Sequence, residues 1–199
     1  MHCRSPVIRR IVVIQGHPES RPGLLRALAD SYVAAAREAG HTVSVIDVSR
    51  LSFPVLRSKA EWSAPAEGDI AQAQALIADA EHLVVFFPIW LGTLPAVLKA
   101  FFEQVFRPGF AIGEGRGRNP FTRLLKGRSA RLVVAMGMPA WLFRTFYLAH
   151  GVMSFKRNIL HFVGIQPVRS TLIGSVDAMD DAGRARWHAR MRRLGRDAA

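Results

Sequence analysis

The chain has 199 residues and a mass of 22.0 kDa, enough to bury one sizeable hydrophobic core, so we expect a single domain spanning 1–199. Half of its residues are hydrophobic and the mean hydropathy is +0.14, values that exclude an intrinsically disordered chain. No apolar run approaches the ~20 residues of a membrane span. The one cysteine, Cys3, excludes an intrachain disulfide and a cysteine-based metal site, and predicts a reducing, cytoplasmic setting.

The net charge is +12 and the isoelectric point about 11.4. Arginine accounts for most of this charge and is concentrated in two segments, Arg107–Arg131 and Arg184–Arg196. A basic chain can bind nucleic acid or acidic membranes, but no helix-turn-helix, zinc or RNA-binding motif accompanies the arginines. We therefore interpret the charge as an effect of composition and solubility that could help to bind phosphorylated ligands, and we expect no nucleic-acid partner.

The first predicted element is a short buried strand, Ile11–Gln15, which is followed by a loop and a helix over Leu24–Ala39. A loop between a strand and a helix N-terminus is a favourable place to bind an anion, because free backbone N–H groups point into it. The candidate side chains for such an anion are His17, Ser20 and Arg21. Ser20 could equally cap the helix, and a loop histidine is more often simply solvated.

The second strand is predicted at Thr42–Val48, where apolar and polar residues alternate as they do near a sheet edge. The next segment, Ser49–Gly68, is rich in proline and serine and is expected to be irregular, with Trp62 exposed. A helix capped by Asp69 is predicted to run to about Ala80.

The most informative stretch is His82–Phe106. Its first part, Leu83–Phe87, is wholly apolar, β-branched or aromatic, which indicates a strand buried on both faces of a parallel sheet. A helical period starts at Pro95. The intervening loop, Pro88–Gly92, offers backbone N–H groups and an aromatic wall, features that suit a flat cofactor such as a flavin. An ordinary strand-to-helix turn with a core tryptophan fits the same residues equally well.

The basic segment Gly109–Gly127 is rich in glycine, but its glycines at Gly113–Gly117 follow a helix instead of a strand. They are therefore expected to form a flexible loop and not a dinucleotide-binding turn. A fourth strand is predicted at Leu132–Met136, and it ends in the loop Gly137-Met138-Pro139.

The apolar segment Trp141–Val163 is predicted to be helical in two pieces that are broken near Gly151. A fifth strand, Val168–Ile173, and a final helix, Asp180–Leu194, complete the chain. Five strands that alternate with helices indicate an α/β fold with a doubly wound parallel sheet, for which 2-1-3-4-5 is the natural strand order.

In that order the loops after strands one, three and four meet at the carboxyl edge of the sheet, where ligands bind in open α/β folds. These loops are His17–Gly23, Pro88–Gly92 and Met136–Pro139. Each is suited to a different part of one ligand.

Three passages resemble the flavodoxin-like NAD(P)H:quinone dehydrogenases: GHPES after the first strand, FFPIWLGTLPAVLKAFFEQVF, and AHGVMSFKRNILHFVGI. The second passage is the most specific, since that family has a proline-aromatic loop followed by an aromatic-rich helix. The resemblance extends over nearly the whole chain and implies a flavodoxin-like, flavin-binding domain.

The resemblance implies a set of cofactor-binding residues in the three loops: His17, Ser20, Arg21, Gly23 and Leu24; Pro88, Ile89, Trp90, Leu91 and Gly92; Met136, Gly137 and Met138. It implies His150 as the catalytic residue, and no metal. The family's tyrosine would fall at Phe143 or Arg144, neither of which is a phenol, although Tyr147 could substitute. The family's Ser-Phe-Asn is replaced near Pro22, which leaves fewer side-chain donors for a phosphate.

The activity implied by the resemblance is ping-pong transfer of two electrons from NADH or NADPH, through bound FMN or FAD, to a quinone-like acceptor. The sequence leaves the choice of flavin and of nicotinamide open. A homodimer is implied as well, with Trp141–Val163 as the candidate surface. Two alternatives are a regulatory subunit bound to a membrane transporter of the potassium-efflux type and a flavin electron carrier, although such carriers are usually acidic.

Overall fold

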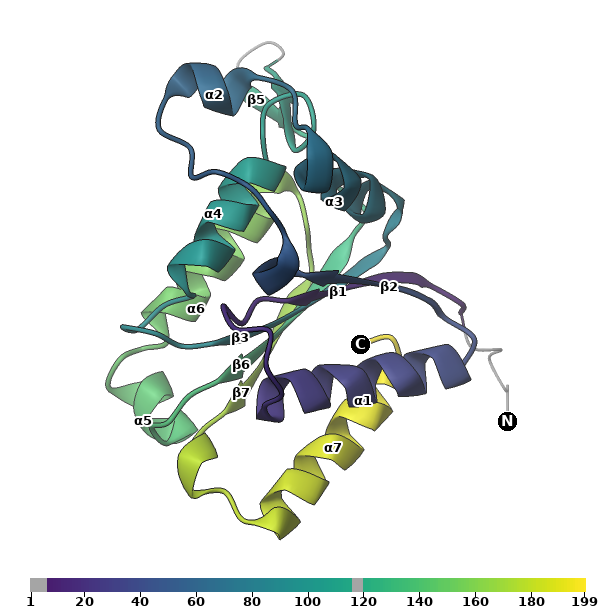
Figure 1. Ribbon diagram of the computed structural model, residues 1–199, viewed down its shortest axis with the longest axis vertical. Helices are drawn as coiled ribbons and strands as arrows, with labels where there is room; N and C mark the ends of the chain where they lie inside the picture. The colour runs from purple at the N-terminus through teal and green to yellow at the C-terminus, as the bar shows by residue number, and fades with distance from the viewer. Residues whose placement is uncertain (1–6, 116–119) are drawn as a thin grey trace.

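The centre of the fold is a five-stranded sheet, seen in the computed structural model of Figure 1, which describes residues 7–115 and 120–199. Its strands are β1 (Arg10–Gln15), β2 (Thr42–Asp47), β3 (His82–Pro88), β6 (Ser129–Ala135) and β7 (Val168–Ile173). They are ordered β2-β1-β3-β6-β7, and every neighbouring pair is parallel. The predicted 2-1-3-4-5 sheet is therefore confirmed.

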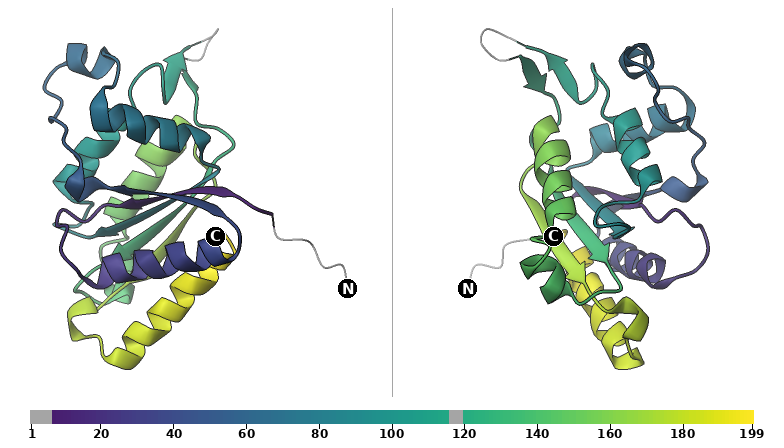
Figure 2. Two further views of the ribbon diagram at one scale, coloured as in Figure 1. Left: turned by 45° about the vertical axis from the view of Figure 1, so that its right-hand side comes forward. Right: turned by 90° about the vertical axis from the view of Figure 1, so that its left-hand side faces the viewer.

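Helices cover both faces of this sheet (Figures 1 and 2), with α1 and α7 on one face and α3, α4 and α6 on the other. The α-helices are α1 (Leu24–Glu38), α2 (Lys59–Ser63), α3 (Gly68–Asp79), α4 (Ala96–Val105), α5 (Ala140–Thr145), α6 (His150–Ser154) and α7 (Asp181–Arg196). Two 3₁₀ turns, η1 (Val48–Arg50) and η3 (Val176–Ala178), and a π-helical segment, η2 (Phe155–His161), join them.

The hydrophobic core lies in two layers, one on each side of the sheet. In β1, Val12 and Ile14 face α3 and α4, whereas Ile11 and Val13 face α1 and α7. All residues of β3 up to Phe87 are buried, as expected for a central parallel strand covered on both faces. This arrangement leaves the ends of the strands as the places where polar groups gather.

The basic segment after α4 is not simply a flexible loop. It contains a small antiparallel hairpin of β4 (Ile112–Glu114) and β5 (Phe121–Arg123), whose register pairs Glu114 with Phe121. Phe121 packs on Phe162 of the neighbouring layer, with ring centroids 4.6 Å apart, and this contact holds the hairpin against the body of the protein. The predicted loop residues Arg116 and Gly117 lie outside the described residues.

The segment between β2 and α3 is irregular as predicted, apart from η1 and α2. Trp62 lies in α2 and is only half-exposed, because it lines an apolar hollow with Phe102 and Phe162, so its predicted exposure was wrong. The predicted cap was also wrong: Glu67 is the N-cap residue of α3, and Asp69 instead accepts a hydrogen bond from the Ser52 backbone N–H at 2.7 Å.

The helical segment after β6 is in two pieces, as predicted, and the break lies at residues 146–149, just before Gly151. Leu148 and Ala149 have positive φ values of 50° and 48°, which separate α5 from α6. Gly151 lies inside α6, where a Cβ atom would be 2.0 Å from the carbonyl oxygen of Gly92. The glycine therefore permits α6 to touch the loop after β3, and it does not end a helix.

Candidate functional site

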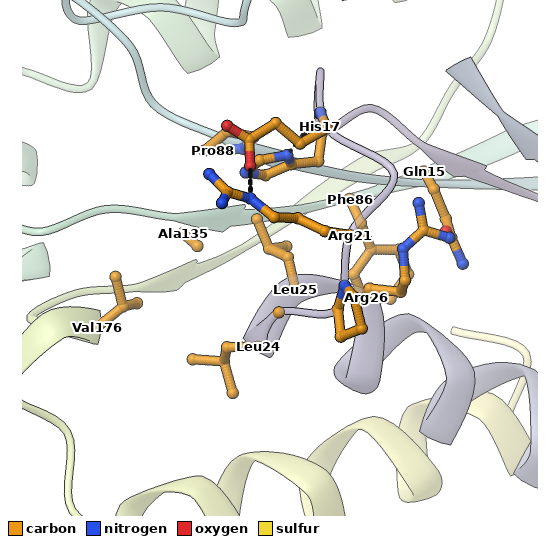
Figure 3. Close-up of a pocket in the computed structure, with 13 residues that line it drawn as sticks. Gln15, His17, Arg21, Leu24, Leu25, Arg26, Phe86, Pro88, Ala135 and Val176 are labelled. Carbon is orange, nitrogen blue, oxygen red and sulfur yellow. Dashed lines mark hydrogen bonds and ion pairs between the residues drawn. The ribbon is translucent and has the colours of Figure 1, made fainter. Parts of the chain in front are cut away.

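A cavity of about 210 Å³ opens at the carboxyl edge of the sheet, between the loop after β1, the first turns of α1 and the ends of β3 and β6 (Figure 3). Its lining residues are Gln15, His17, Glu19, Arg21, Pro22, Gly23, Leu24, Leu25, Arg26, Phe86, Pro88, Ala135 and Val176. Polar groups come mainly from the loop and α1, and apolar groups from the strand ends.

The N-terminus of α1 faces this cavity without a side-chain cap. Gly23 is the N-cap residue, in an extended conformation, and the first backbone bond of the helix runs from Ala27 N–H to the Gly23 carbonyl at 3.0 Å. The N–H groups of the first turn thus have no cap acceptor and carry the positive end of the helix dipole. Ser20 is exposed and does not cap the helix, so that interpretation was wrong.

Three neighbouring residues of the first loop form a polar chain. The Arg21 guanidinium donates to the Glu19 carboxylate, which holds the pKa of Glu19 below and that of Arg21 above its usual value. The Glu19 backbone N–H donates to His17 Nδ1 at 3.0 Å. Because Nδ1 accepts, the neutral ring carries its hydrogen on Nε2, which leaves His17 able to donate to a ligand.

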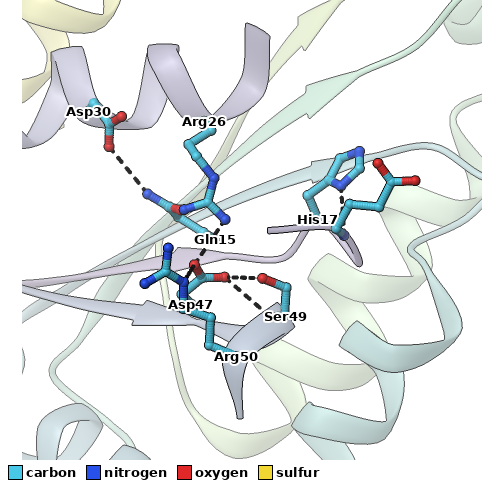
Figure 4. Close-up of polar contacts among 8 residues, drawn as sticks. Gln15, His17, Arg26, Asp30, Asp47, Ser49 and Arg50 are labelled. Carbon is cyan, nitrogen blue, oxygen red and sulfur yellow. Dashed lines mark hydrogen bonds and ion pairs between the residues drawn. The ribbon is translucent and has the colours of Figure 1, made fainter. Parts of the chain in front are cut away.

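A second polar chain approaches the cavity from α1 and β2 (Figure 4). Arg26 Nη2 lies 2.9 Å from Asp47 Oδ2, and Arg50 Nε lies 3.1 Å from the same oxygen. The other carboxylate oxygen accepts from the Ser49 backbone N–H and hydroxyl. Two guanidinium groups therefore share one carboxylate, and that carboxylate fixes Arg26 at the wall of the cavity.

Gln15 ends β1 at the wall of the cavity with 6% of its surface exposed. Its Nε2 donates to Asp30 over 3.4 Å, while its Oε1 is buried and has no hydrogen-bond partner in the described part of the chain (Figure 4). A buried acceptor without a donor is unfavourable, so Oε1 is suited to receive a hydrogen bond from a ligand.

The loop after β3 lies beside the cavity. Trp90 and Thr93 exchange backbone hydrogen bonds of 2.9 and 3.1 Å, and the Ile89 N–H donates to the Ala135 carbonyl at 2.8 Å. Leu91 and Gly92, both exposed, form the tip with positive φ values of 47° and 82°. Of the residues predicted here, Pro88 lines the cavity, and residues 89–92 lie outside its lining.

The loop after β6 is tied to the loop after β7. Met136, which is 3% exposed, donates its N–H to Ile173 and accepts from the Val176 N–H, and Met138 accepts from the Ser175 N–H. Neither predicted methionine lines the cavity, and neither does the exposed Gly137. Val176 reaches the cavity in their place.

The predicted catalytic residue, His150, is exposed at the start of α6 and does not line the cavity. Its neighbour Gly151 contacts Gly92, which places His150 near the loop after β3. Phe143 is 1% exposed and belongs to the core, whereas Tyr147 is 46% exposed and packs on Phe146 with ring centroids 5.0 Å apart.

The cavity thus unites a subset of the predicted cofactor residues: His17, Arg21, Gly23, Leu24 and Pro88. It also recruits residues that the sequence did not single out: Gln15, Glu19, Pro22, Leu25, Arg26, Phe86, Ala135 and Val176. The sequence contained a signal for Gln15, because it is a polar residue at the end of an apolar strand. Arg26 gave no such signal, since its position is like that of any solvent-exposed arginine on a helix.

Two features are absent from residues 7–115 and 120–199. No three histidine, cysteine, aspartate or glutamate side chains there are grouped as a metal ion would require. None of the helices in those residues is both long and apolar enough to span a membrane.

Comparison with known proteins agrees with this geometry. Residues 9–194 match the family described as flavodoxin-like fold. The chain is 26% identical over 188 residues to an FMN-dependent NADH:quinone oxidoreductase of Burkholderia lata, covering 85% of each. It is 36% identical over 76 residues, 38% of each chain, to a glutathione-regulated potassium-efflux system ancillary protein of Cronobacter sakazakii.

Among solved structures, an NAD(P)H:quinone oxidoreductase from Methanothermobacter marburgensis superposes with a TM-score of 0.81 at 25% identity, covering 97% of this chain and 100% of that one. The match of the family over residues 9–194, together with the observed strand order, shows that the chain belongs to the family with the flavodoxin-like fold.

Proposed function

We propose that the protein is a flavin-dependent NAD(P)H oxidoreductase that transfers two electrons to quinone-like acceptors. The observation that carries this proposal is the cavity at the carboxyl edge, which combines a cationic end with an apolar wall. The names of the relatives support it, because they include an FMN-dependent NADH:quinone oxidoreductase similar to the chain over 85% of its length.

The cationic end of the cavity fits a flavin phosphate. Arg21 and Arg26 approach it from two sides, and the uncapped N-terminus of α1 adds backbone N–H groups. These groups compensate for the small number of hydroxyl and amide side chains in the first loop. A terminal phosphate, as in FMN, matches them better than FAD does, and we propose FMN as the cofactor.

The remaining lining fits the less polar part of the same cofactor. Leu24, Leu25, Phe86 and Pro88 supply apolar surface, and the unpaired Oε1 of Gln15 can accept from a hydroxyl or N–H group. A bound flavin supplies hydride acceptance from a nicotinamide and two-electron delivery to a quinone. The protein's part is to hold the phosphate and to exclude water from one side of the ring.

The predicted residues outside the cavity lining have a place in this proposal. Leu91, Gly92 and Gly137 lie in loops at the same edge, and we assign their backbone N–H groups to the polar rim of the ring as fixed dipoles. His150, next to the Gly92 loop through Gly151, is assigned as a proton donor to the acceptor.

We further propose that the protein is a homodimer in the cytoplasm. Several large apolar side chains are exposed around the turn between α5 and α6 and on the loop after β3: Trp90, Leu91, Trp141, Phe146, Tyr147 and Leu148. A monomer rarely exposes such a patch, so a second copy of the chain is the expected partner. The patch includes part of the predicted segment Trp141–Val163.

A regulatory role at a membrane transporter is the second candidate. The similarity to the potassium-efflux ancillary protein favours it, but it extends over 38% of the chain, whereas the oxidoreductase similarity extends over 85%. Co-purification with a transporter from membranes would support this role, in addition to the enzyme activity.

The test is the visible spectrum of the purified protein before and after NADPH or NADH is added without oxygen. We expect a flavin spectrum that bleaches with the nicotinamide and returns when a quinone is added. Extraction and chromatography of the flavin then separate FMN from FAD. A protein that binds neither flavin would contradict the proposal.

A further inference from the structure

A second polar cluster lies at the opposite end of the sheet, among buried residues that the proposed activity does not use. Its members are His82 of β3, Arg131 of β6, Thr171 of β7 and Tyr32 of α1. Arg131 is paired with Val84 and Arg169 in the sheet register, while His82 is paired with Ser129, two residues before Arg131. These side chains therefore face α1 and α7 from adjacent strands.

Three buried atoms of this cluster have no hydrogen-bond partner within residues 7–115 and 120–199: Tyr32 Oη, His82 Nε2 and Arg131 Nε. The residues are 0%, 3% and 7% exposed, respectively. Two of their other polar atoms are hydrogen-bonded, since Arg131 Nη1 donates to Thr171 Oγ1 and His82 Nδ1 contacts Ser129 Oγ, both at 2.8 Å. Each unpaired atom can carry a hydrogen, so the cluster offers three potential donors on the same face of the sheet.

The cluster is also cationic: Arg9, Arg131 and Arg169 act on its members, and, in addition to burial, the carboxylate of Asp197 is near enough to raise the pKa of Tyr32. All 15 acidic residues of the chain lie in its described part, yet none of the ion pairs observed there includes Arg131, Arg169 or Arg9. Burial, with the charge of Arg169, lowers the pKa of Arg131. Burial and the nearby Arg9, Arg131 and Arg169 lower the pKa of His82 to about 3. The surroundings are thus strongly positive.

A buried guanidinium without a negative partner is costly, and buried polar groups in folded proteins are almost always hydrogen-bonded. We infer that this cluster binds one small inorganic anion, of the size of chloride, between Arg131, His82 and Tyr32. The donors come from the sheet and from α1, so the anion joins the helix layer to the strands.

The backbones of α7 and α1 pack closely beside the cluster. Gly195 of α7 crosses α1 at Tyr32, where a Cβ atom would lie 2.3 Å from the Tyr32 carbonyl oxygen. At the edge, His41 accepts from the Arg9 N–H at 3.1 Å, and Arg9 Nη1 donates to the Ala198 carbonyl at 3.4 Å. These contacts tie the C-terminal end of the chain to the residue that precedes β1 and to the segment after α1.

The test is thermal unfolding of the full chain in sodium chloride and in sodium gluconate at equal ionic strength. A specific anion site predicts that chloride raises the midpoint temperature by several degrees and that the effect saturates. Tyr32→Phe removes one donor but keeps the ring that packs on Phe86. It should raise the half-saturating chloride concentration about 5- to 10-fold.

The matched control is Tyr147→Phe, which removes the same hydroxyl from the other tyrosine of the chain, on the opposite edge of the sheet. Its chloride response should equal that of the wild type. Crystals soaked in bromide should show anomalous scattering beside Arg131. Equal rises of the midpoint temperature in chloride and in gluconate would overturn the inference. So would an equal change of the half-saturating chloride concentration in the two tyrosine variants. A bromide peak without an effect of Tyr32→Phe would indicate an adventitious ion only.

Discussion

Arg21 and Arg26 both reach the cavity as partners of a carboxylate, but the two pairs differ in exposure. The side chains of Arg21 and Glu19 are 77% and 45% exposed, so their ion pair is screened by water and salt and contributes little. Those of Arg26 and Asp47 are 21% and 15% exposed, and Ser49 fixes the carboxylate. For the phosphate that we propose, Arg26 is therefore a preformed contact and Arg21 an adjustable one.

This difference predicts the effect of removing Arg26. We expect Arg26→Gln to weaken FMN binding roughly 10-fold, the usual effect of one charge-assisted hydrogen bond, and to leave riboflavin binding nearly unchanged. Fluorescence titration of the apoprotein with both flavins measures this. Arg10→Gln, at the far end of β1, is the control and should alter neither affinity. Equal loss of both flavins would show that Arg26 acts on the fold alone.

His82 predicts a pH dependence of stability. Its pKa is about 3 in the folded chain, against 6.5 for an ordinary histidine, so between these values only the unfolded chain binds the proton. The free energy of unfolding is therefore highest above pH 6.5 and falls as the pH drops toward 3, by up to about 1.4 kcal/mol per pH unit.

Urea unfolding at pH 7, 6 and 5 in chloride-free buffer measures this slope. His82→Gln should flatten it, because glutamine takes up no proton, while the carboxylates contribute equally to both proteins. An identical slope in the variant would mean that burial and the surrounding arginines do not keep the imidazole neutral.

At the scale of elements, the regular strands and long helices were predictable because hydrophobic periodicity reports burial directly. The strands β1, β3 and β7 were found within one residue of their limits at each end. The hairpin of β4 and β5 was missed because its strands have only three residues each and pack through distant contacts such as that of Phe121 with Phe162. Local sequence carries no record of such a contact.

The residues of the candidate site likewise divide into those that local sequence predicts and those that it does not. The loop after β1 was identified from its position between a strand and a helix, and it does supply His17, Arg21 and Gly23 to the cavity. Phe86 and Ala135 were missed because apolar residues at strand ends cannot be distinguished from core residues by sequence. Val176 was missed because only the bonds between two loops bring it to the cavity.

The contact between α6 and the loop after β3 can be tested with Gly151→Ala. Helix propensity alone would favour alanine by about 1 kcal/mol. However, the new Cβ would lie 2.0 Å from the Gly92 carbonyl oxygen, so we expect a net loss of about 1–3 kcal/mol in the free energy of unfolding. Urea denaturation measures it, with the exposed Ser154→Ala as the control. A stabilised Gly151→Ala would contradict the close contact.

At the scale of the whole molecule, the exposed apolar patch predicts association. Phe146 and Leu148 are 74% and 59% exposed on the turn between α5 and α6. If this patch is the dimer surface, replacing both residues with serine should halve the mass measured by light scattering after gel filtration. The control is Val55→Ser, which changes a similarly exposed residue, 60%, away from the patch. An unchanged dimer in the double variant would place the interface elsewhere.

The two polar clusters lie at opposite ends of one sheet, and both touch α1. The first turns of α1 line the cavity, and Tyr32, farther along the helix, belongs to the cationic cluster. In the single domain that we expect, α1 therefore connects the two ends of the sheet. Some of the arginines that give the chain its net charge of +12 lie at these two ends: Arg21 and Arg26 at the cavity, and Arg131 and Arg169 at the cationic cluster.

Trp90 stands at the edge of the cavity, half-exposed, with its ring 6.1 Å from that of His17 in an edge-to-face arrangement. The indole is therefore a built-in optical reporter: any molecule that enters between the two loops changes the surroundings of this ring and hence its emission. Trp187, which lies under the guanidinium of Arg190, is on α7, away from this loop. Comparing wild type with Trp90→Phe would let ligand entry be timed without attaching a dye.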